Sequence, residues 1–329
     1  MTKTRNTYMD LVKAILIYLV ILGHSIQLIG YKSTAPFWDD SLFKAIYSFH
    51  MQLFIAISGY FTYFSLAKKS ILNFLKDRFC NTFIPMLAWC VLAFLVQSLI
   101  FKTFSFTDLF SVIELNYWFI WALLLFSFIT CYAKKLKVDN IYFWLISIPI
   151  VISIPFDMFW YPWIKSIYSY FVIGYLVAKV DLSTIIIKLK KYNTLIFSAS
   201  IICFIIYPQN AFLYITPSSI FEIKISAFRF ITGCLCSISF LLFVYFIYTK
   251  LLKQNINSLL LDIGSKTLSL YLVQGLFFYI YTVTIIPRYP KVLHNNFFSF
   301  LLSIILFSTF YFTIFLLNKN KGLKKILFG

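Results

Sequence analysis

RNTYMDLVKAILIYLVILGH, residues 5–24, is followed by a second apolar stretch, YSFHMQLFIAISGYF, at residues 47–61. The first stretch contains Lys13 and His24, and the second contains His50. Lys13 and His24 are eleven positions apart, which on an α-helix is about three turns, roughly 16 Å of rise and an offset of about 20°. Both side chains therefore share one helix face. Ionisable groups inside an apolar span are costly, so this face is a candidate functional site.

The composition indicates a membrane protein. Of the 329 residues, 61% are hydrophobic and 12% are charged, and the mean hydropathy is +0.86. Soluble domains carry about twice as much charge. We therefore predict an all-α, polytopic membrane helix bundle that forms a single domain over residues 1–329, with no appended soluble domain. The six cysteines show no C-x-x-C spacing, so we expect neither a disulfide framework nor a metal site.

About ten segments are apolar and long enough to cross a bilayer. The predicted spans are 8–30, 42–66, 79–101, 116–133, 140–156, 163–179, 192–208, 223–249, 267–287 and 297–317. Prolines at positions 149, 155 and 162 interrupt the region around 140–180, so the boundaries there are ambiguous.

Positive charge alternates between the segments that flank these spans. Twenty Lys and Arg residues fall in one set of flanking segments, which includes both termini, and six fall in the other set. The formal net charge of +18 could indicate a nucleic-acid partner, but this alternation is typical of membrane topology. We therefore expect no nucleic-acid binding and place both termini in the cytoplasm.

Six motifs follow one another along most of the chain. They are DLVKAILIYLVILGH at 10–24, FHMQLFIAISGYF at 49–61, RFCNTFIP at 78–85, NYWFIWALL at 116–124, YFVIGYLVA at 170–178 and IGSKTLSLYLVQ at 263–274. In this order the chain resembles the integral-membrane acyltransferases of family 3, which transfer acyl groups to sugars of surface polysaccharides and antibiotics. The signature of that family is a basic residue, ten intervening residues and a histidine, and Lys13 and His24 match it.

The resemblance implies a membrane O-acyltransferase, most simply an O-acetyltransferase, in a bacterial plasma membrane. It would move an acyl group from cytoplasmic acyl-CoA to a hydroxyl of a cell-surface or extracellular polysaccharide. Acetyl-CoA would be a co-substrate, and no bound cofactor is expected. The expected partners are acyl-CoA, the glycan acceptor, the lipid bilayer and the machinery of polysaccharide synthesis. Two alternatives stay open: a non-enzymatic polysaccharide exporter or flippase, and a membrane partner that only organises a synthase complex.

The expected catalytic residues are His24 and His50, because an imidazole can take a proton from a sugar hydroxyl near neutral pH. A buried histidine that is only hydrogen-bonded to a neighbour is the structural alternative for both. The expected donor contacts are Lys13, Arg78, Asp10 and Lys76, since cations attract the phosphates of coenzyme A. Asp10 and Lys13 are helix neighbours and could equally form an ion pair. Arg78 could equally be a topology charge, and Asn81 stands where the family often has a second arginine.

The expected acceptor contacts are Glu114, Tyr117, Trp118 and Gln274. Aromatic faces stack on sugar rings, although Tyr and Trp at a membrane interface also form belts without any ligand. Gln274 stands where the family often has histidine. A glutamine can form hydrogen bonds but cannot act as a base at neutral pH.

Overall fold

The computed structural model describes residues 6–30, 37–102, 104–156, 158–180, 182–206, 220–252, 258–285 and 295–329. All regular elements in these ranges are helices, which confirms the predicted all-α class for this part of the chain. The elements are α1 (Thr7–Gly30), η1 (Phe37–Asp39), α2 (Ser41–Tyr47), α3 (His50–Lys68), α4 (Ile71–Arg78), η2 (Phe79–Phe83), α5 (Ile84–Phe101), α6 (Phe106–Leu115), α7 (Trp118–Lys135), α8 (Ile141–Ser153), α9 (Tyr161–Val177), α10 (Leu182–Lys190), α11 (Asn193–Ile206), α12 (Ile220–Ile247), η3 (Tyr248–Leu252), α13 (Ser258–Ser265), α14 (Thr267–Ile280), η4 (Tyr281–Ile285), α16 (Asn296–Leu317) and α17 (Lys321–Phe328).

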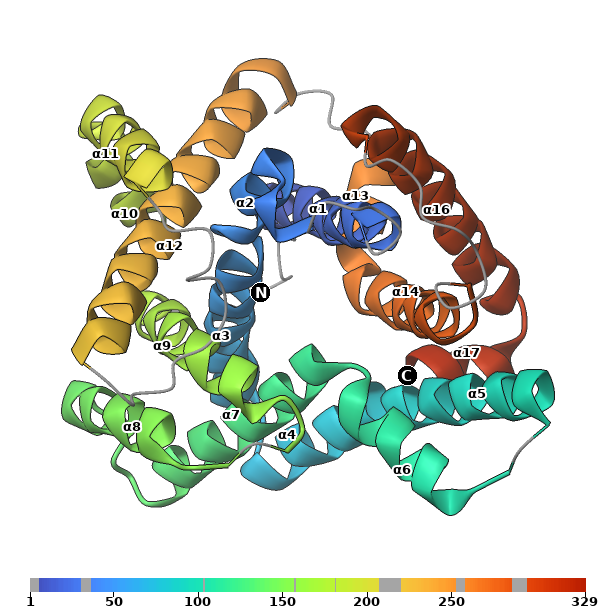
Figure 1. Cartoon of the computed structure of the whole chain (residues 1–329). Coiled ribbons are helices and arrows are strands. Elements are labelled where there is room, and N and C mark those ends of the chain that lie inside the picture. Colours follow the sequence, from blue (N-terminus) through green and yellow to red (C-terminus); the bar gives the residue numbers. More distant parts are fainter. Residues whose placement is uncertain are drawn as a thin grey trace.

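Helix α1 lies near the middle of the bundle, with α3 and α9 on one side and α13, α14 and α16 on the other (Figure 1). Helices α11 and α12 pack together at one edge, and α5 packs on α14 at the opposite edge. Helix α9 is a core element, because thirteen of its seventeen residues are buried. The first helix, with its ionisable face, is therefore surrounded by protein.

The crossing of α3 and α9 is made close by two glycines. A Cβ atom added to Gly59 would collide with the carbonyl oxygen of Phe171, and one added to Gly174 would collide with that of Ala56. Small residues allow helix backbones to approach closely in membranes, where packing rather than hydrophobic exclusion holds helices together. This contact holds the middle of α3 against α9.

Ten membrane spans were predicted, but fewer helices in the described part of the chain are long and apolar enough to cross a bilayer. Six described helical segments meet it: Thr7–Ile29, Ile71–Phe101, Trp118–Lys135, Ile223–Lys250, Thr267–Thr284 and Asn296–Leu317. A seventh span would be the pair Thr184–Lys190 and Asn193–Ile206, which is bent by 76°. Helix α8 has only 13 residues, fewer than the roughly 20 that a bilayer requires. The prediction of ten spans is thus not confirmed.

Two predictions made from the sequence are wrong. The span predicted at 42–66 is not one helix, because α2 ends at Tyr47 and α3 begins at His50. The reason is Phe49, whose backbone angles (φ −144°, ψ −25°) are not helical. The charge count also included Lys165 among the six residues of the smaller set of flanking segments, but this lysine lies within α9 and is only 4% exposed.

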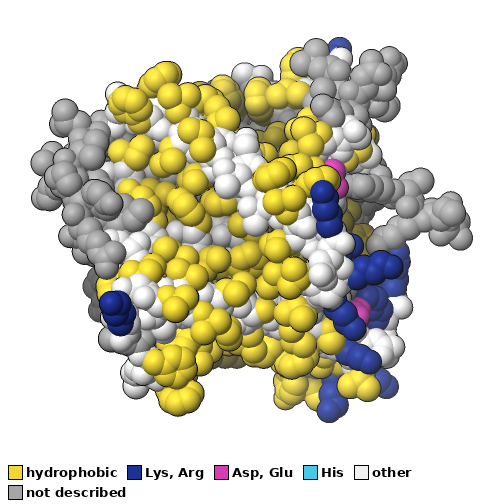
Figure 2. Space-filling view, turned by 90° about the vertical axis from the view of Figure 1, so that its right-hand side faces the viewer, with side chains coloured by type: hydrophobic (Ala, Val, Ile, Leu, Met, Phe, Trp, Pro, Cys, Tyr) yellow, Lys and Arg dark blue, Asp and Glu magenta, His cyan; other side chains and the backbone are white. Residues whose placement is uncertain are grey.

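The surface has the pattern expected of a protein embedded in lipid. Figure 2 shows a face covered by hydrophobic side chains, with Lys and Arg gathered along one edge. Helix α16 exposes nine large apolar side chains: Phe297, Phe298, Phe300, Leu301, Ile304, Ile305, Phe312, Phe315 and Leu316. Exposing an apolar face of this extent to water would be unfavourable, whereas contact with lipid tails is not.

Candidate active site

A cavity of about 150 Å³ lies where the C-terminal half of α1, the α2–α3 junction, the beginnings of α7 and α9 and the middle of α14 meet. Its lining residues are Val20, His24, Gln27, Tyr47, His50, Met51, Asn116, Tyr117, Trp118, Trp160, Trp163, Tyr271, Gln274, Gly275 and Phe278. We call it the histidine cavity. It brings together both predicted catalytic histidines and three of the four predicted acceptor contacts.

His24 is held in this cavity by two residues of α14. The side-chain amide nitrogen Nε2 of Gln274 lies 2.9 Å from Nδ1 of His24. The ring of Phe278 lies against the imidazole, with 4.5 Å between the ring centroids. Because an amide NH₂ can only donate, Nδ1 accepts this hydrogen bond and a neutral His24 carries its proton on Nε2. His24 is thus arranged to donate a hydrogen bond from Nε2.

The break between α2 and α3 gives His50 the opposite tautomer. The last carbonyls of a helix lack intrahelical partners, and here side chains just beyond α2 supply them. Ser48 Oγ donates to the Ala45 carbonyl at 2.8 Å, and Gln52 Nε2 donates to the Tyr47 carbonyl at 3.3 Å. His50 Nδ1 lies 2.8 Å from the Ile46 carbonyl oxygen.

A carbonyl oxygen can only accept, so Nδ1 of His50 carries the proton in this contact. In the neutral ring, Nε2 of His50 therefore keeps its lone pair and can take a proton. His50 is only 1% exposed, and the ring of Tyr47 packs edge-on against it, with centroids 4.3 Å apart. The imidazole is accordingly fixed in both orientation and tautomer.

Two of the aromatic residues that line the cavity lie at strained backbone positions. Tyr117 and Trp160, which directly precede α7 and α9, have φ of 55° and 58°. Bulky residues rarely adopt this left-handed conformation, and such outliers gather at functional sites. The Tyr117 hydroxyl donates to the Leu272 carbonyl at 2.7 Å, and Trp118 packs edge-on against Trp163, with centroids 5.5 Å apart.

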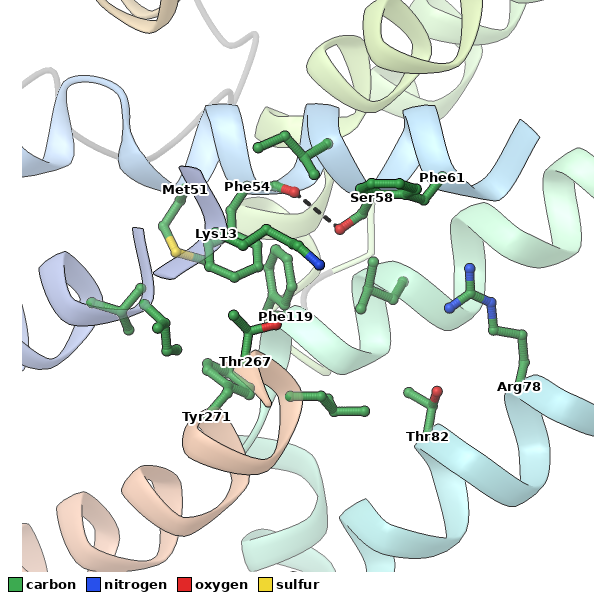
Figure 3. A pocket seen from close by; sticks show the side chains of 15 residues that line it. Lys13, Met51, Phe54, Ser58, Phe61, Arg78, Thr82, Phe119, Thr267 and Tyr271 are labelled. Carbon is green, nitrogen blue, oxygen red and sulfur yellow. Dashed lines mark hydrogen bonds between the residues drawn. The ribbon is translucent and has the colours of Figure 1, made fainter. Parts of the chain in front are cut away.

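A second cavity, of about 190 Å³, lies beside the N-terminal half of α1. We call it the cation cavity, because Lys13 and Arg78 line it. The Lys13 amine and the Arg78 guanidinium reach into the same space from opposite sides (Figure 3). Lys13 pairs with Asp10 at 2.9 Å and lies 5.3 Å from the centre of the Phe61 ring. Arg78 donates from Nη2 to Thr62 Oγ1 at 3.0 Å.

The two cavities share part of their walls. Val20, Met51 and Tyr271 line both of them. Met51 and Tyr271 lie at the end of the cation cavity away from Arg78 (Figure 3). The cation cavity thus adjoins the histidine cavity at the end farthest from its arginine.

Three predicted contacts lie outside both linings. Asp10 is buried beside Lys13 as its ion-pair partner. Lys76 is an exposed side chain of α4. Glu114 Oε1 accepts a hydrogen bond from the backbone nitrogen of Phe159 at 3.4 Å, and so supports the turn that carries Trp160. Within the described residues, no group of three or more His, Cys, Asp or Glu side chains could hold a metal ion.

Sequence reasoning missed four residues of the histidine cavity that the chain itself hinted at. Gln27 lies three positions after His24 and therefore on the same helix face. Asn116 immediately precedes Tyr117 in the NYWFIWALL motif. Trp160 and Trp163 lie in the proline-interrupted region that we interpreted only as an ambiguous helix boundary.

A family model described as an acyltransferase domain matches residues 6–322 of the chain. The chain belongs to this acyltransferase family. With its family and its apolar helices established, it is a multi-pass membrane protein of the acyltransferase class. The predicted family resemblance is thereby confirmed.

Two relatives in this comparison are called nodulation protein NolL. The protein from Mesorhizobium japonicum is 31% identical over 299 residues, covering 84% of this chain and 78% of the relative. The protein from Sinorhizobium fredii is 29% identical over 286 residues, covering 83% of this chain and 78% of the relative. Among solved structures, none matches.

Proposed function

We propose that this member of the acyltransferase family is an O-acetyltransferase of a bacterial plasma membrane. Acetyl-CoA would enter the cation cavity from the cytoplasm, and a hydroxyl of a cell-surface polysaccharide would enter the histidine cavity from the other side. This orientation, with both termini in the cytoplasm, is supported by the twenty-to-six distribution of Lys and Arg. The machinery of polysaccharide synthesis would supply the acceptor.

The observation that carries the proposal is the pair of adjoining cavities. One contains two cations, which suit the phosphates of coenzyme A. The other contains two imidazoles, which suit proton transfer. Lys13 and His24 lie on one helix face, roughly 16 Å apart along the axis, and the shared residues Val20 and Met51 lie between the cavities. Along such a path, the acetyl end of an extended acetyl-CoA would reach the histidines while its phosphates would stay in the cation cavity.

The tautomers support distinct roles for the two histidines. His50 accepts the proton of the acceptor hydroxyl at Nε2 while the hydroxyl oxygen attacks the thioester carbonyl. A carbon–oxygen bond forms and the carbon–sulfur bond breaks, and the thiolate leaves with the proton that His50 took. His24 donates from Nε2 to the carbonyl oxygen, where negative charge develops in the transition state. The sequence left both histidines as candidates for the base, and this assignment gives that role to His50.

The test is to narrow the passage between the two cavities without substituting a histidine, Lys13 or Arg78. Val20→Phe should reduce O-acetylation of the surface polysaccharide at least about tenfold, because acyl transfer is sensitive to displacements of about 1 Å. Val12→Phe is the matched control, because Val12 is also buried in α1 but lines neither cavity. Both changes add similar bulk and should cost similar stability, about 1–3 kcal/mol.

The readout is base-labile acetate on purified surface polysaccharide from cells that produce each variant. Variant levels in the membrane and melting temperatures in detergent show whether both proteins fold. Wild-type acetate with Val20→Phe would contradict transfer through this passage. Polysaccharide that reaches the surface only when the protein is present, with unchanged acetate per sugar, would favour an exporter instead.

A further inference from the structure

Three amide side chains of the histidine cavity keep a polar atom without a hydrogen-bond partner among the described residues. These atoms are Oε1 of Gln27, Nδ2 of Asn116 and Oε1 of Gln274. The side chains are buried, with 7%, 9% and 2% of their surfaces exposed. A buried polar atom without a partner has lost its hydrogen bonds to water without compensation and so destabilises the fold. Three such atoms around one cavity indicate a ligand that supplies the missing hydrogen bonds.

In two of these amides, the other polar atom of the side chain already has a hydrogen-bond partner in the protein. Asn116 Oδ1 accepts from the backbone nitrogen of Tyr117 at 3.2 Å. Gln274 Nε2 donates to His24. Each amide is therefore oriented by the protein, and its other end is left for a ligand.

The free atoms define the chemistry of that ligand. Two carbonyl oxygens require donors, and one NH₂ group requires an acceptor. A hydroxyl group both donates and accepts, so a polyhydroxylated ring can satisfy all three. A carboxylate or phosphate only accepts, and it would face the carbonyl oxygens of Gln27 and Gln274 without compensation.

The rest of the lining also disfavours a charged ligand. None of the fifteen described lining residues is Lys, Arg, Asp or Glu. An anion moved from water into this cavity would lose its hydration without gaining a cation, which is costly. The aromatic residues, Trp118, Trp160 and Trp163 among them, instead offer large apolar faces with few polar atoms.

We propose that the histidine cavity binds one neutral sugar residue of the acceptor, and that Gln27, Asn116 and Gln274 select it against uronic acids and phosphorylated sugars. This inference rests on the proposed acetyl transfer, because it assigns the cavity to the acceptor. The cavity volume of about 150 Å³ suits a single ring rather than a longer segment of chain. The selectivity lies in the amides, since a neutral ring and its oxidised counterpart offer the same apolar faces to the indoles.

The experiment measures binding without any acetyl donor. The full-length protein in lipid nanodiscs is mixed with matched pairs of ligands: methyl glucoside with methyl glucuronide, and methyl galactoside with methyl galacturonide. Saturation-transfer NMR and quenching of tryptophan fluorescence report contact with the cavity. We expect at least one neutral glycoside to bind at least tenfold more tightly than its uronide. Equal or tighter binding of the uronides, or binding of no glycoside, would overturn the inference.

Asn116→Asp is the decisive variant, because it replaces the free NH₂ group with an acceptor of the same shape. We expect it to weaken binding of the neutral glycoside about tenfold, which is about the effect of one lost hydrogen bond of 1.4 kcal/mol. Asn318→Asp is the matched control. Asn318 also has a buried side-chain atom without a partner, but it follows α16 and does not line the cavity. Equal binding by the two variants would also overturn the inference.

Acetyl transfer is measured separately, so the two proposals can fail independently. Selective binding of a neutral glycoside without acetyl transfer would refute the proposed reaction and leave the cavity assignment standing. Acetyl transfer that runs equally well on uronides would leave the reaction standing and refute the selectivity. Melting temperatures of both asparagine variants show whether a loss of binding reflects a loss of folding.

Discussion

The amide nitrogen of Gln274 lies 2.9 Å from Nδ1 of His24, although the two residues are 250 positions apart in the chain. This contact makes Nδ1 an acceptor and leaves the proton of a neutral His24 on Nε2. The amide therefore positions the imidazole and determines which nitrogen carries the proton. A glutamine at this point of α14 can do so without taking part in proton transfer.

Gln274→Leu should lower kcat for acetyl transfer roughly tenfold, as expected for one lost hydrogen bond of about 1–1.5 kcal/mol. The KM for acetyl-CoA should stay unchanged, because Gln274 does not line the cation cavity. Gln274→Glu should lower kcat further, since a carboxylate accepts a hydrogen bond from Nδ1–H and so moves the proton of a neutral His24 from Nε2 to Nδ1. Steady-state kinetics at saturating acceptor provide the measurement. A Gln274→Glu enzyme faster than Gln274→Leu would indicate that His24 is the base.

Glutamine substitutions at the two histidines separate their roles. His50→Gln should reduce transfer by about 10²–10⁴-fold, the usual loss when a general base is removed. His24→Gln should retain more activity than His24→Ala, because a glutamine NH₂ can still donate to the thioester carbonyl. Transfer rates of purified, folded variants decide between the roles. The reverse pattern, with His24→Gln inactive and His50→Gln active, would exchange the two assignments.

Arg78→Ala should raise the KM for acetyl-CoA about tenfold and change kcat little, as expected when a group binds ground state and transition state alike. The rise should shrink at high salt, because screening weakens the attraction in the wild-type protein. Lys76→Ala is the matched control from the same helix, since Lys76 is exposed and lies outside the cation cavity. Equal effects of the two substitutions would mean that general surface charge, not the cavity, attracts the donor.

Asp139, in the connection between α7 and α8, should stabilise the fold in a pH-dependent way. Its carboxylate accepts hydrogen bonds from Lys179 at 2.8 Å, Trp144 at 2.8 Å and Tyr175 at 2.9 Å. Burial raises the pKa of Asp139, but these hydrogen bonds outweigh burial and bring the pKa below its ordinary value.

A lowered folded-state pKa gives stability that is present above the unfolded-state value of about 3.9 and is lost as the pH falls through the folded-state value. Asp139→Asn should therefore cost about 1–3 kcal/mol at neutral pH. Thermal unfolding in detergent should show a gap between wild type and variant that narrows below about pH 4. A gap that stays constant from neutral to acidic pH would show that the charge of Asp139 does not matter.

The span predictions show where local pattern stops being informative. The segments 8–30 and 297–317 correspond closely to α1 and α16. Both are unbroken apolar runs of about the length that crosses a bilayer as a helix. The segment 42–66 is equally apolar, yet its helix breaks before His50. The side chains of Ser48, His50 and Gln52 stabilise the break by forming hydrogen bonds with the carbonyls at the end of α2. A hydropathy window does not detect such hydrogen bonds.

By itself, the sequence determined the helical membrane class, the family and the common face of Lys13 and His24, because helix period and apolar length act over neighbouring residues. It also pointed to His50, Tyr117, Trp118 and Gln274 as residues of interest. Only the tertiary structure decided that these side chains meet in one cavity. Contacts between α1 and α14, or between α7 and α9, depend on how whole helices pack, and that packing is a property of the assembled bundle. The packing of α14 against α1 also set the tautomer of His24, because Gln274 lies 250 positions from it in the chain, whereas the tautomer of His50 follows from a carbonyl only four residues away.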